Sequence, residues 1–462
     1  MKKQHFLSVL VLLSALLITA STIDLSNLYN YGAQGKPGYI NKDNTPVTNS
    51  ITDARATLGR VLFYDKKLSA NNSIACASCH NQAFAFSDTA VRSVGLNGGL
   101  TGRHSMRLVN ARYGTSPSFF WDERAPTLEH QVTEPIQDHV EMGFSGLSGQ
   151  AGIDSLIRKM ATLSYYPQLF QFAFGSPEIT EAKMQQAMAQ FVRSIQSFDS
   201  KFDIGRAQVP GQGMPFPNFT ANENAGKQIF MHAQGMGTPG CQSCHRMPEF
   251  DIDPLSLNNG VITKAGDQTG FDLTNTRAPS LRNLFNPSGS LNGPLMHNGA
   301  FTTIEQVIEH YNAIPQNPAN TNLDPRLNGP GGNLQLTALQ KTQLADFLRT
   351  LTGVDVFTNP KWSNPFDASG NITILGLNSS IYQNKAEKFT IFPNPASQFI
   401  YLKLPQGQYN VHMYGINGQL IYSGTAEASE RIDLPGFAAG FITITAVNQT
   451  TGWMYQAKFI KQ

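Results

Sequence analysis

Charged side chains are scarce in this 462-residue chain, and neither sign dominates. Lys and Arg number 34 and Asp and Glu 32, so charged residues make up 14% of the sequence and the formal net charge is +2. This balance gives no reason to expect a nucleic-acid partner. The 40 glycines and 26 prolines favour long loops packed around a buried cofactor over an idealised helical bundle. The length suffices for two or three domains.

Long apolar runs are absent after the N-terminus. The chain begins with the basic residues Lys2 and Lys3, the apolar run 6–18 and the small residues 19–21. This order predicts a signal peptide over residues 1–20 that is removed on export. A membrane anchor is the alternative, although the run is too short to span a bilayer comfortably.

Cysteine occurs only four times, always within a C-x-x-C-H motif. The two motifs consist of Cys76, Cys79 and His80, and of Cys241, Cys244 and His245. In such a motif the sulfurs form thioethers to the haem vinyl groups and the imidazole ligates the iron. Disulfides, thiol-redox pairs and zinc half-sites are the alternatives. Because the motifs use every cysteine of an exported chain, they predict two covalently bound c-type haems.

Similar segments precede the two motifs. Residues 56–63 and 224–230 both have the pattern of a short amphipathic helix whose glycine faces a close neighbour. The repetition predicts a mainly α fold with two cytochrome c-like haem domains, over residues 50–215 and 216–353.

Further short motifs follow one another in a fixed order between residues 53 and 353. They include Gly102-Arg103, Leu108-Val109-Asn110, Phe120-Trp121-Asp122-Glu123-Arg124, Leu128-Glu129-His130-Gln131, Val140-Glu141-Met142-Gly143 and Gly293-Pro294-Leu295-Met296-His297-Asn298-Gly299. In this order and spacing they resemble the bacterial dihaem cytochrome c peroxidase family, which includes MauG-like members.

The resemblance implies a division of labour between the two haems. The haem on His80 would be the peroxidatic site that meets hydrogen peroxide. The haem on His245 would receive electrons from a small c-type cytochrome or copper protein. Trp121 matches a tryptophan that relays electrons between the haems, with a plain core residue as the alternative. Glu141 and Gln131 match the polar residues on the open face of the first haem.

Chemistry supports Glu141 and Gln131 independently. Heterolytic cleavage of peroxide needs a proton moved from one oxygen to the other. A carboxylate in an apolar haem pocket has a raised proton affinity, and a neighbouring amide can hold the peroxide. A solvated loop acid is the alternative for Glu141. We therefore predict Glu141, Gln131 and Trp121 as catalytic residues.

The chain departs from the family pattern beside the first haem. Many members have a histidine in the loop after the first motif that ligates the resting iron, but residues 93–99 contain none. The first haem is therefore expected to be open, as in MauG-like members. His104 stands where the family has an asparagine that helps to hold calcium. A calcium site would then rest on the carbonyls of Asn292 and Pro294.

Residues 303–311 have the periodicity of a helix near the second haem. One apolar face contains Ile304, Val307, Ile308 and Tyr311. Tyr311 is thus expected to point inward and His310 to the polar side. The family has methionine at this position in ordinary peroxidases and tyrosine in MauG-like members. The resemblance therefore implies that Tyr311 ligates the second iron, with a core tyrosine and ligation by Met296 as alternatives.

The last part of the chain changes character. A linker over residues 354–386 is followed by alternating strands over 387–462, with Asn417-Gly418 as a hairpin turn. We expect a small β-sandwich. Pro393-Asn394-Pro395 and Lys458-Phe459-Ile460-Lys461 resemble the C-terminal sorting domain of type IX secretion. The resemblance implies that the protein enters the periplasm and is then attached to the cell surface or released. The type IX secretion machinery would be its partner in this step. A carbohydrate-binding or adhesive sandwich is the alternative.

Three functions fit these features. The first is a peroxidase that reduces hydrogen peroxide with electrons from a small redox protein. The second is a MauG-like oxidase that acts through high-valent iron on a protein or a small substrate, and Tyr311 favours it. The third is a dihaem electron carrier without catalysis, against which Glu141 beside an open haem argues. We rank the peroxidase first.

Overall fold

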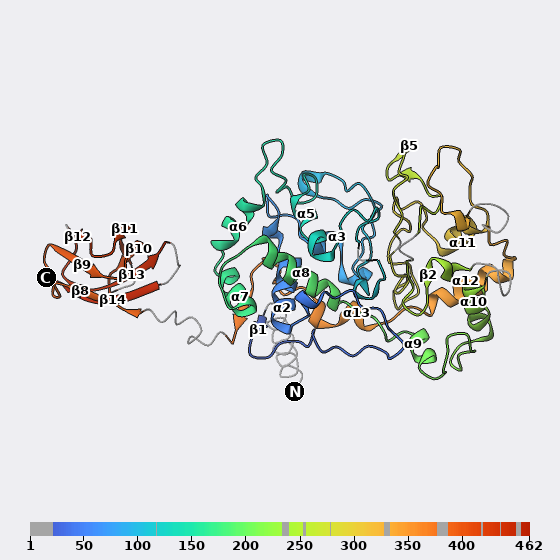
Figure 1. The fold of residues 1–462 in the computed structure, drawn as a ribbon, viewed down its shortest axis with the longest axis horizontal. Helices are drawn as coiled ribbons and strands as arrows, with labels where there is room; N and C mark the ends of the chain where they lie inside the picture. The colour runs from blue at the N-terminus through green and yellow to red at the C-terminus, as the bar shows by residue number, and fades with distance from the viewer. Residues whose placement is uncertain are drawn as a thin grey trace, which may run out of the picture. The chain divides into compact units, whose positions relative to one another are not determined.

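The computed structural model describes residues 22–116, 118–232, 240–252, 256–277, 279–327, 333–376, 387–416, 419–434, 436–449 and 454–462. The chain divides into two compact units, Met1–Ile374 and Leu375–Gln462 (Figure 1). The expected signal peptide and the Asn417-Gly418 turn lie outside the described residues. Within the described ranges, no helix combines the length and the apolar character needed to cross a membrane.

The first unit is mainly helical. Its α-helices are α2 (Asp53–Tyr64), α3 (Cys76–Cys79), α4 (Leu128–Gln131), α5 (Glu134–Gln137), α6 (Ile153–Ala161), α7 (Tyr165–Phe174), α8 (Glu181–Ser194), α9 (Lys201–Arg206), α10 (Ala221–Met231), α11 (Ile304–Asn312), α12 (Ala338–Arg349) and α13 (Asp355–Thr358). Three small sheets pair β1 (Thr22–Asp24) with β6 (Thr373–Leu375), β2 (His245–Arg246) with β3 (Asp251–Ile252), and β4 (Thr263–Lys264) with β5 (Asp267–Phe271). Long loops connect these elements, as the glycine and proline content predicts.

Two helix pairs of this unit cross at a glycine. A Cβ atom on Gly59 of α2 would lie 2.0 Å from the carbonyl oxygen of Ala187 in α8. A Cβ atom on Gly226 of α10 would lie 1.9 Å from the carbonyl oxygen of Gln343 in α12. Only glycine permits these approaches, because a side chain of any other residue would collide with the facing backbone. The same crossing therefore precedes each C-x-x-C-H motif, as the repeated sequence pattern predicts.

Segments outside the two expected haem domains also pack on the helical unit. Trp362 is fully buried, and its indole Nε1–H donates to Ser194 Oγ at 3.2 Å. Tyr31 is buried as well, and its hydroxyl donates to the carbonyl of Lys361. Residues 355–366, which we expected in the linker, thus pack with the helices because their aromatic side chains find apolar partners there. The boundary expected between residues 215 and 216 falls inside this unit and stays a prediction.

The second unit is β-rich, as the alternating pattern predicts. One sheet has the order β11-β10-β13-β14-β7 and the other β12-β9-β8. The strands are β7 (Glu387–Lys388), β8 (Thr390–Phe392), β9 (Phe399–Lys403), β10 (Gln408–Tyr414), β11 (Leu420–Glu427), β12 (Arg431–Asp433), β13 (Gly440–Asn448) and β14 (Met454–Lys461). In β10 the residues Tyr409, Val411 and Met413 are fully buried, which follows from the two-residue repeat of a strand. One apolar core contains residues of both sheets.

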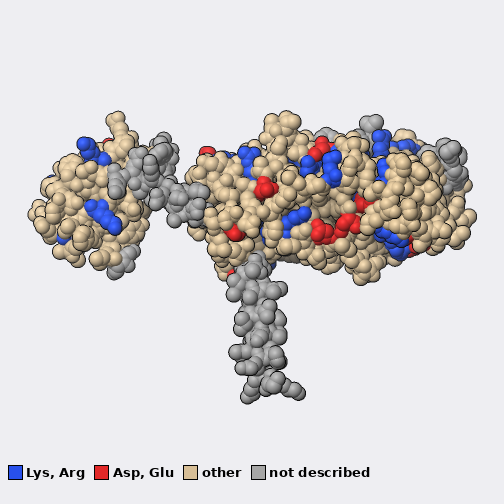
Figure 2. All heavy atoms as spheres, turned by 90° about the horizontal axis from the view of Figure 1, so that it is seen from below, with Lys and Arg blue, Asp and Glu red and all other residues tan. Residues whose placement is uncertain are grey.

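Charge is distributed thinly over the surface that Figure 2 displays. Lysine, arginine, aspartate and glutamate side chains lie there singly or in small groups among uncharged residues. This view agrees with the low and balanced charge of the sequence.

Candidate functional site: two cavities with C-x-x-C-H motifs

Each C-x-x-C-H motif lines a cavity in the helical unit. The first cavity has a volume of about 670 Å³ and is lined by Cys76, Cys79 and His80. The second cavity has a smaller volume, about 190 Å³, and is lined by Cys241, Cys244 and His245. The first motif lies on the short helix α3 with His80 as its C-cap, and the second begins in the 3₁₀ turn η6 (Cys241–Ser243). The motifs thus present sulfur and imidazole to a cavity at two separate places.

The four cysteines are free thiols. Burial raises the pKa of Cys76 and of Cys241 to about 12, and that of Cys79 to about 11. A reactive redox cysteine needs a lowered pKa, which these sites do not provide. The thiol-redox alternative therefore loses support, while thiols that face a cavity suit covalent attachment of a haem.

Both motif histidines are held in the form that binds a metal. The imidazole of His80 donates from Nδ1 to the carbonyl of Phe86 at 3.1 Å, which leaves Nε2 available for iron. Burial lowers the pKa of His80, and it lowers the pKa of His245 to about 4. At His245 a backbone hydrogen bond with Phe250 opposes this shift. The neutral rings and the cavities beside them fit two c-type haems.

A thin partition separates the two cavities. Seven residues line both of them: His104, Ser105, Met106, Arg107, Trp121, Arg277 and Pro279. The amide of His104 donates to the carbonyl of His297 at 2.7 Å, and the amide of Arg277 donates to that of Trp121 at 3.0 Å. These backbone bonds hold the partition in place between the two motifs.

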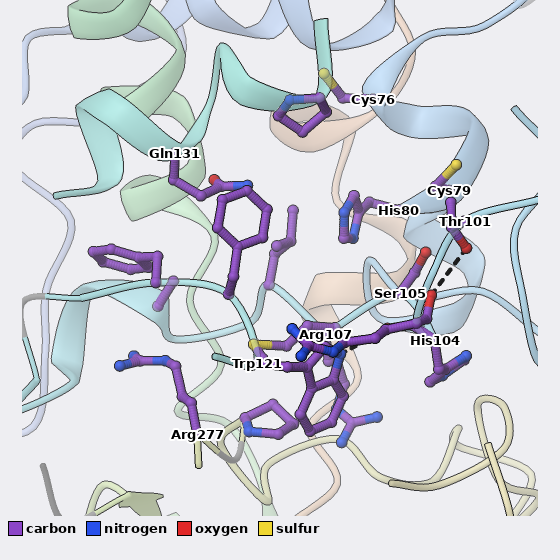
Figure 3. Close-up of a pocket in the computed structure, with 18 of the residues that line it drawn as sticks. Cys76, Cys79, His80, Thr101, His104, Ser105, Arg107, Trp121, Gln131 and Arg277 are labelled. Carbon is purple, nitrogen blue, oxygen red and sulfur yellow. Dashed lines mark hydrogen bonds between the residues drawn. The ribbon is translucent and has the colours of Figure 1, made fainter. Parts of the chain in front are cut away.

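Trp121 lies in this partition, where the sequence places a relay. Its indole Nε1–H donates to the carbonyl of His104 at 2.8 Å. The ring also meets His297 edge-to-face, with centroids 6.2 Å apart. Figure 3 shows Trp121 at the lower side of the first cavity, across from His80. The ring thus lies in the wall that the two cavities share.

Glu141 reaches the first cavity from a tightly bonded loop. The carboxylate of Asp138 accepts hydrogen bonds from the amides of Val140 and Glu141 at 2.8 and 2.9 Å. The amide of Leu96 donates to the Val140 carbonyl at 2.7 Å and ties a second loop to the first. Burial raises the pKa of Glu141 to about 7, the nearby Asp138 adds to this shift, and Arg124 opposes it. Glu141 can therefore exchange a proton near neutral pH.

Gln131 lines the same cavity from the end of α4 (Figure 3). Glu129 of this helix accepts a hydrogen bond from Arg193 Nη2 in α8 at 3.0 Å, which anchors α4 to the helical core. Thr127 caps the helix by accepting from the amide of His130 at 3.1 Å. The structure thus brings both predicted polar residues, Gln131 and Glu141, to the cavity of His80.

Tyr311 lines the second cavity from α11, as the helical periodicity predicts. Asn259 donates from Nδ2 to the Tyr311 hydroxyl at 3.0 Å and to Met296 Sδ at 3.3 Å. Burial raises the pKa of Tyr311, whereas the hydrogen bond from Asn259 opposes the shift. The two ligand candidates, Tyr311 and Met296, therefore share one amide beside the cavity. The sequence pattern contained no signal for Asn259.

The expectation for His310 was wrong. This residue is buried rather than directed to the polar side, with only 9% of its surface exposed. Its Nε2 lies 2.8 Å from the carbonyl of Asn259, and its ring packs against Phe301 with centroids 5.5 Å apart. The helix periodicity missed this because the backbone of Asn259, which is distant in the sequence, covers His310.

The calcium site stays a prediction. Oδ1 of Asn292 is buried and has no hydrogen-bond partner among the residues that the structure describes, and Pro294 lines the second cavity. His104 is committed elsewhere, because its Nδ1 bonds the carbonyl of Ala90 at 2.9 Å. Among the residues that the structure describes, no group of three His, Cys, Asp or Glu side chains is arranged to hold a metal ion.

Comparison with known proteins places these features in a family. Residues 53–208 match the family model described as di-haem cytochrome c peroxidase, and residues 390–462 match the secretion system C-terminal sorting domain. The methylamine utilization protein MauG of Methylorubrum extorquens is 31% identical over 280 residues, which cover 58% of this chain and 70% of that protein. The cytochrome c551 peroxidase of Nitrosomonas europaea is 27% identical over 312 residues, which cover 64% of this chain and 80% of that protein. The crystal structure of a MauG-like protein associated with microbial copper homeostasis aligns with a TM-score of 0.57 at 27% identity, covering 73% of this chain and 99% of that one.

Proposed function

Because the chain belongs to the di-haem cytochrome c peroxidase and MauG family, we propose that it reduces hydrogen peroxide to water with electrons from a small redox protein. The family is one of oxidoreductases, and its members include named peroxidases. The observation that carries the proposal is the pair of cavities, each with a C-x-x-C-H motif, that share Trp121 in their common wall.

The two haems, when bound, supply the iron and electron-transfer chemistry of this reaction. The residues that would hold them are Cys76, Cys79 and His80 in the first cavity, and Cys241, Cys244, His245 and Tyr311 in the second. All other steps fall to the side chains that line the cavities.

Glu141 performs the proton transfer in the proposed reaction. Its carboxylate takes a proton from one oxygen of hydrogen peroxide and returns it to the other, which leaves as water when the O–O bond breaks. A pKa of about 7 suits both halves of this transfer at neutral pH. The amide of Gln131 orients the peroxide by hydrogen bonds from the same cavity wall.

Trp121 connects the two cavities electronically. Its Nε1–H is bonded to a carbonyl oxygen, which is not a base, so the indole retains its proton while an electron passes. The donor would be a small c-type cytochrome or a copper protein that delivers electrons to the second haem. Reduction of one peroxide to two waters uses two such electrons and two protons.

A MauG-like oxidase is the second candidate. Tyr311 favours it, because a phenolate ligand stabilises ferric and higher oxidation states of haem iron better than a thioether does. The lack of a histidine in residues 93–99 favours it as well. In this case the oxidising equivalents would act on a protein or a small substrate.

The chain carries a C-terminal sorting domain of secretion systems, which indicates export. We propose that the type IX secretion machinery recognises it after passage through the periplasm. The helical unit would then act at the cell surface or outside the cell.

Donor oxidation in the haem-loaded protein tests the proposal. Reduced small c-type cytochromes and copper proteins are mixed with the enzyme, and hydrogen peroxide is added in known amount. A peroxidase oxidises two donor molecules per peroxide, and omission of peroxide abolishes the reaction. Peroxide consumption without oxidation of any donor, but with modification of a protein or small substrate, favours the MauG-like candidate.

A further inference from the structure

Arg107 is half-buried in the helical unit and has no anionic partner among the residues that the structure describes. The buried Arg60 also lacks an acid, but its guanidinium bonds the carbonyl and the hydroxyl of Ser363. Arg193 bonds Glu129, Arg282 bonds Asp203, and Arg277 lies 3.6 Å from Glu123. Arg107, in contrast, forms no ion pair with any residue that the structure describes, and its Nε is buried without a hydrogen-bond partner. The positive charge of this guanidinium is therefore unmatched within the described protein.

Arg107 lies in the partition between the two cavities. Its side chain lines both of them. Figure 3 shows it reaching into the first cavity between His80 and Trp121. The neighbouring His104 fixes this segment, because its amide bonds the His297 carbonyl and its carbonyl accepts from Trp121.

An unmatched buried cation is costly. Removal of a charge from water without a compensating partner is strongly unfavourable, so buried guanidinium groups are normally paired with carboxylates. Burial lowers the pKa of Arg107 to about 10, and no neighbouring acid opposes this shift. The missing anion must then arrive with the group that fills the cavities.

We propose that Arg107 binds a propionate carboxylate of at least one of the two haems. The inference rests on the proposed dihaem function. Each haem brings two propionates, and the planar guanidinium matches a carboxylate with two parallel hydrogen bonds. A positive charge at this point stabilises the reduced haem, which carries one negative charge more than the oxidised haem. Arg107 thus raises a reduction potential, whereas a phenolate from Tyr311 would lower one.

The test replaces Arg107 in the full-length, haem-loaded protein. Arg107→Met removes the charge at similar volume, and Arg107→Lys keeps it. Arg92→Met is the matched control, because within the described ranges Arg92 bonds only the carbonyls of Leu100 and Thr101 and lines neither cavity. Haem content is measured first by pyridine haemochrome, since a chain without two haems contradicts the proposed function rather than the role of Arg107.

Spectroelectrochemical titration then measures both reduction potentials. We expect Arg107→Met to lower at least one of the two reduction potentials, and by more than Arg92→Met does. Arg107→Lys, which keeps the positive charge, should have potentials close to those of the unaltered protein. Resonance Raman bands of propionate bending should move in the same variants. If Arg107→Met does not mature, the displaced propionate bands of Arg107→Lys carry the test. Two haems with unchanged potentials and unchanged propionate bands would overturn the proposal.

Discussion

The side-chain amide of Asn259 donates a hydrogen bond to the Tyr311 hydroxyl at 3.0 Å, at the wall of the second cavity. The same amide also reaches Met296 Sδ at 3.3 Å. A phenol oxygen and a thioether are thus held side by side. The phenol lies on the face of α11 that the apolar periodicity directs inward.

We expect Tyr311 to set the reduction potential of the second haem. Tyr311→Met should raise this potential on the order of 0.1 V, within the roughly 0.8 V range that axial ligands span, because a thioether favours the reduced state. Tyr311→Phe should leave an open or water-ligated iron with an altered EPR spectrum. Asn259→Leu is the matched variant that removes the hydrogen bond and keeps the phenol. An EPR spectrum and potentials that Tyr311→Phe leaves unchanged would make Tyr311 a core residue and Met296 or His297 the ligand to test.

The raised pKa of Glu141 predicts how the peroxidase activity depends on pH. Burial raises its pKa to about 7, so the carboxylate that accepts the first proton is populated above pH 7 and lost below it. The value of kcat/KM for hydrogen peroxide should therefore rise with pH through about 7. Glu141→Gln should retain both haems, lower the rate roughly a hundred-fold or more, and abolish this titration. Full activity of Glu141→Gln at saturating donor would remove the residue from the mechanism.

The glycine at each helix crossing predicts a stability defect. Gly59→Ala places a methyl group where the Ala187 carbonyl oxygen lies 2.0 Å away, so α2 and α8 must separate. The free energy of unfolding should fall by about 1–3 kcal/mol or more, as for other overpacked cores. Gly38→Ala serves as the control, because its Cβ would meet no atom within 4 Å. Equal denaturation midpoints for the two variants would contradict the close crossing.

The sorting domain should be separable from the chemistry. Residues 375–462 form a compact unit of their own. Removal of residues 387–462 should leave the haem spectra and peroxide turnover unchanged but strand the enzyme in the periplasm. Fractionation of cells that produce either the full-length or the shortened chain measures this. Surface delivery of the shortened chain would refute the role of the domain.

Sequence patterns predicted the local features of this site well. The residues of a C-x-x-C-H motif are neighbours in the chain, so the motif can be recognised without the fold. The helical repeat of residues 304–311 likewise predicts from the sequence alone that Tyr311 points inward. Family membership, the mainly helical first unit and the β-rich second unit are confirmed.

Contacts between distant loops were not predictable in this way. Asn259 and Arg107 belong to irregular segments whose sequences have no periodicity, and their importance depends on what faces them in space. His310 was misplaced for the same reason, since a loop 51 residues earlier in the chain covers its face of α11. Residues 355–366 likewise pack on the helices because Trp362 is buried there, although the composition of this segment is typical of a linker.

Haem stoichiometry tests the central claim most directly. The full-length chain is produced with the c-type maturation machinery, and pyridine haemochrome absorbance is combined with the intact mass. The account predicts two haems per chain, both covalently attached, and a loss of one haem in a Cys76→Ala, Cys79→Ala double variant. A single haem in the unaltered chain, or a mass that indicates two disulfides in place of thioethers, would contradict it.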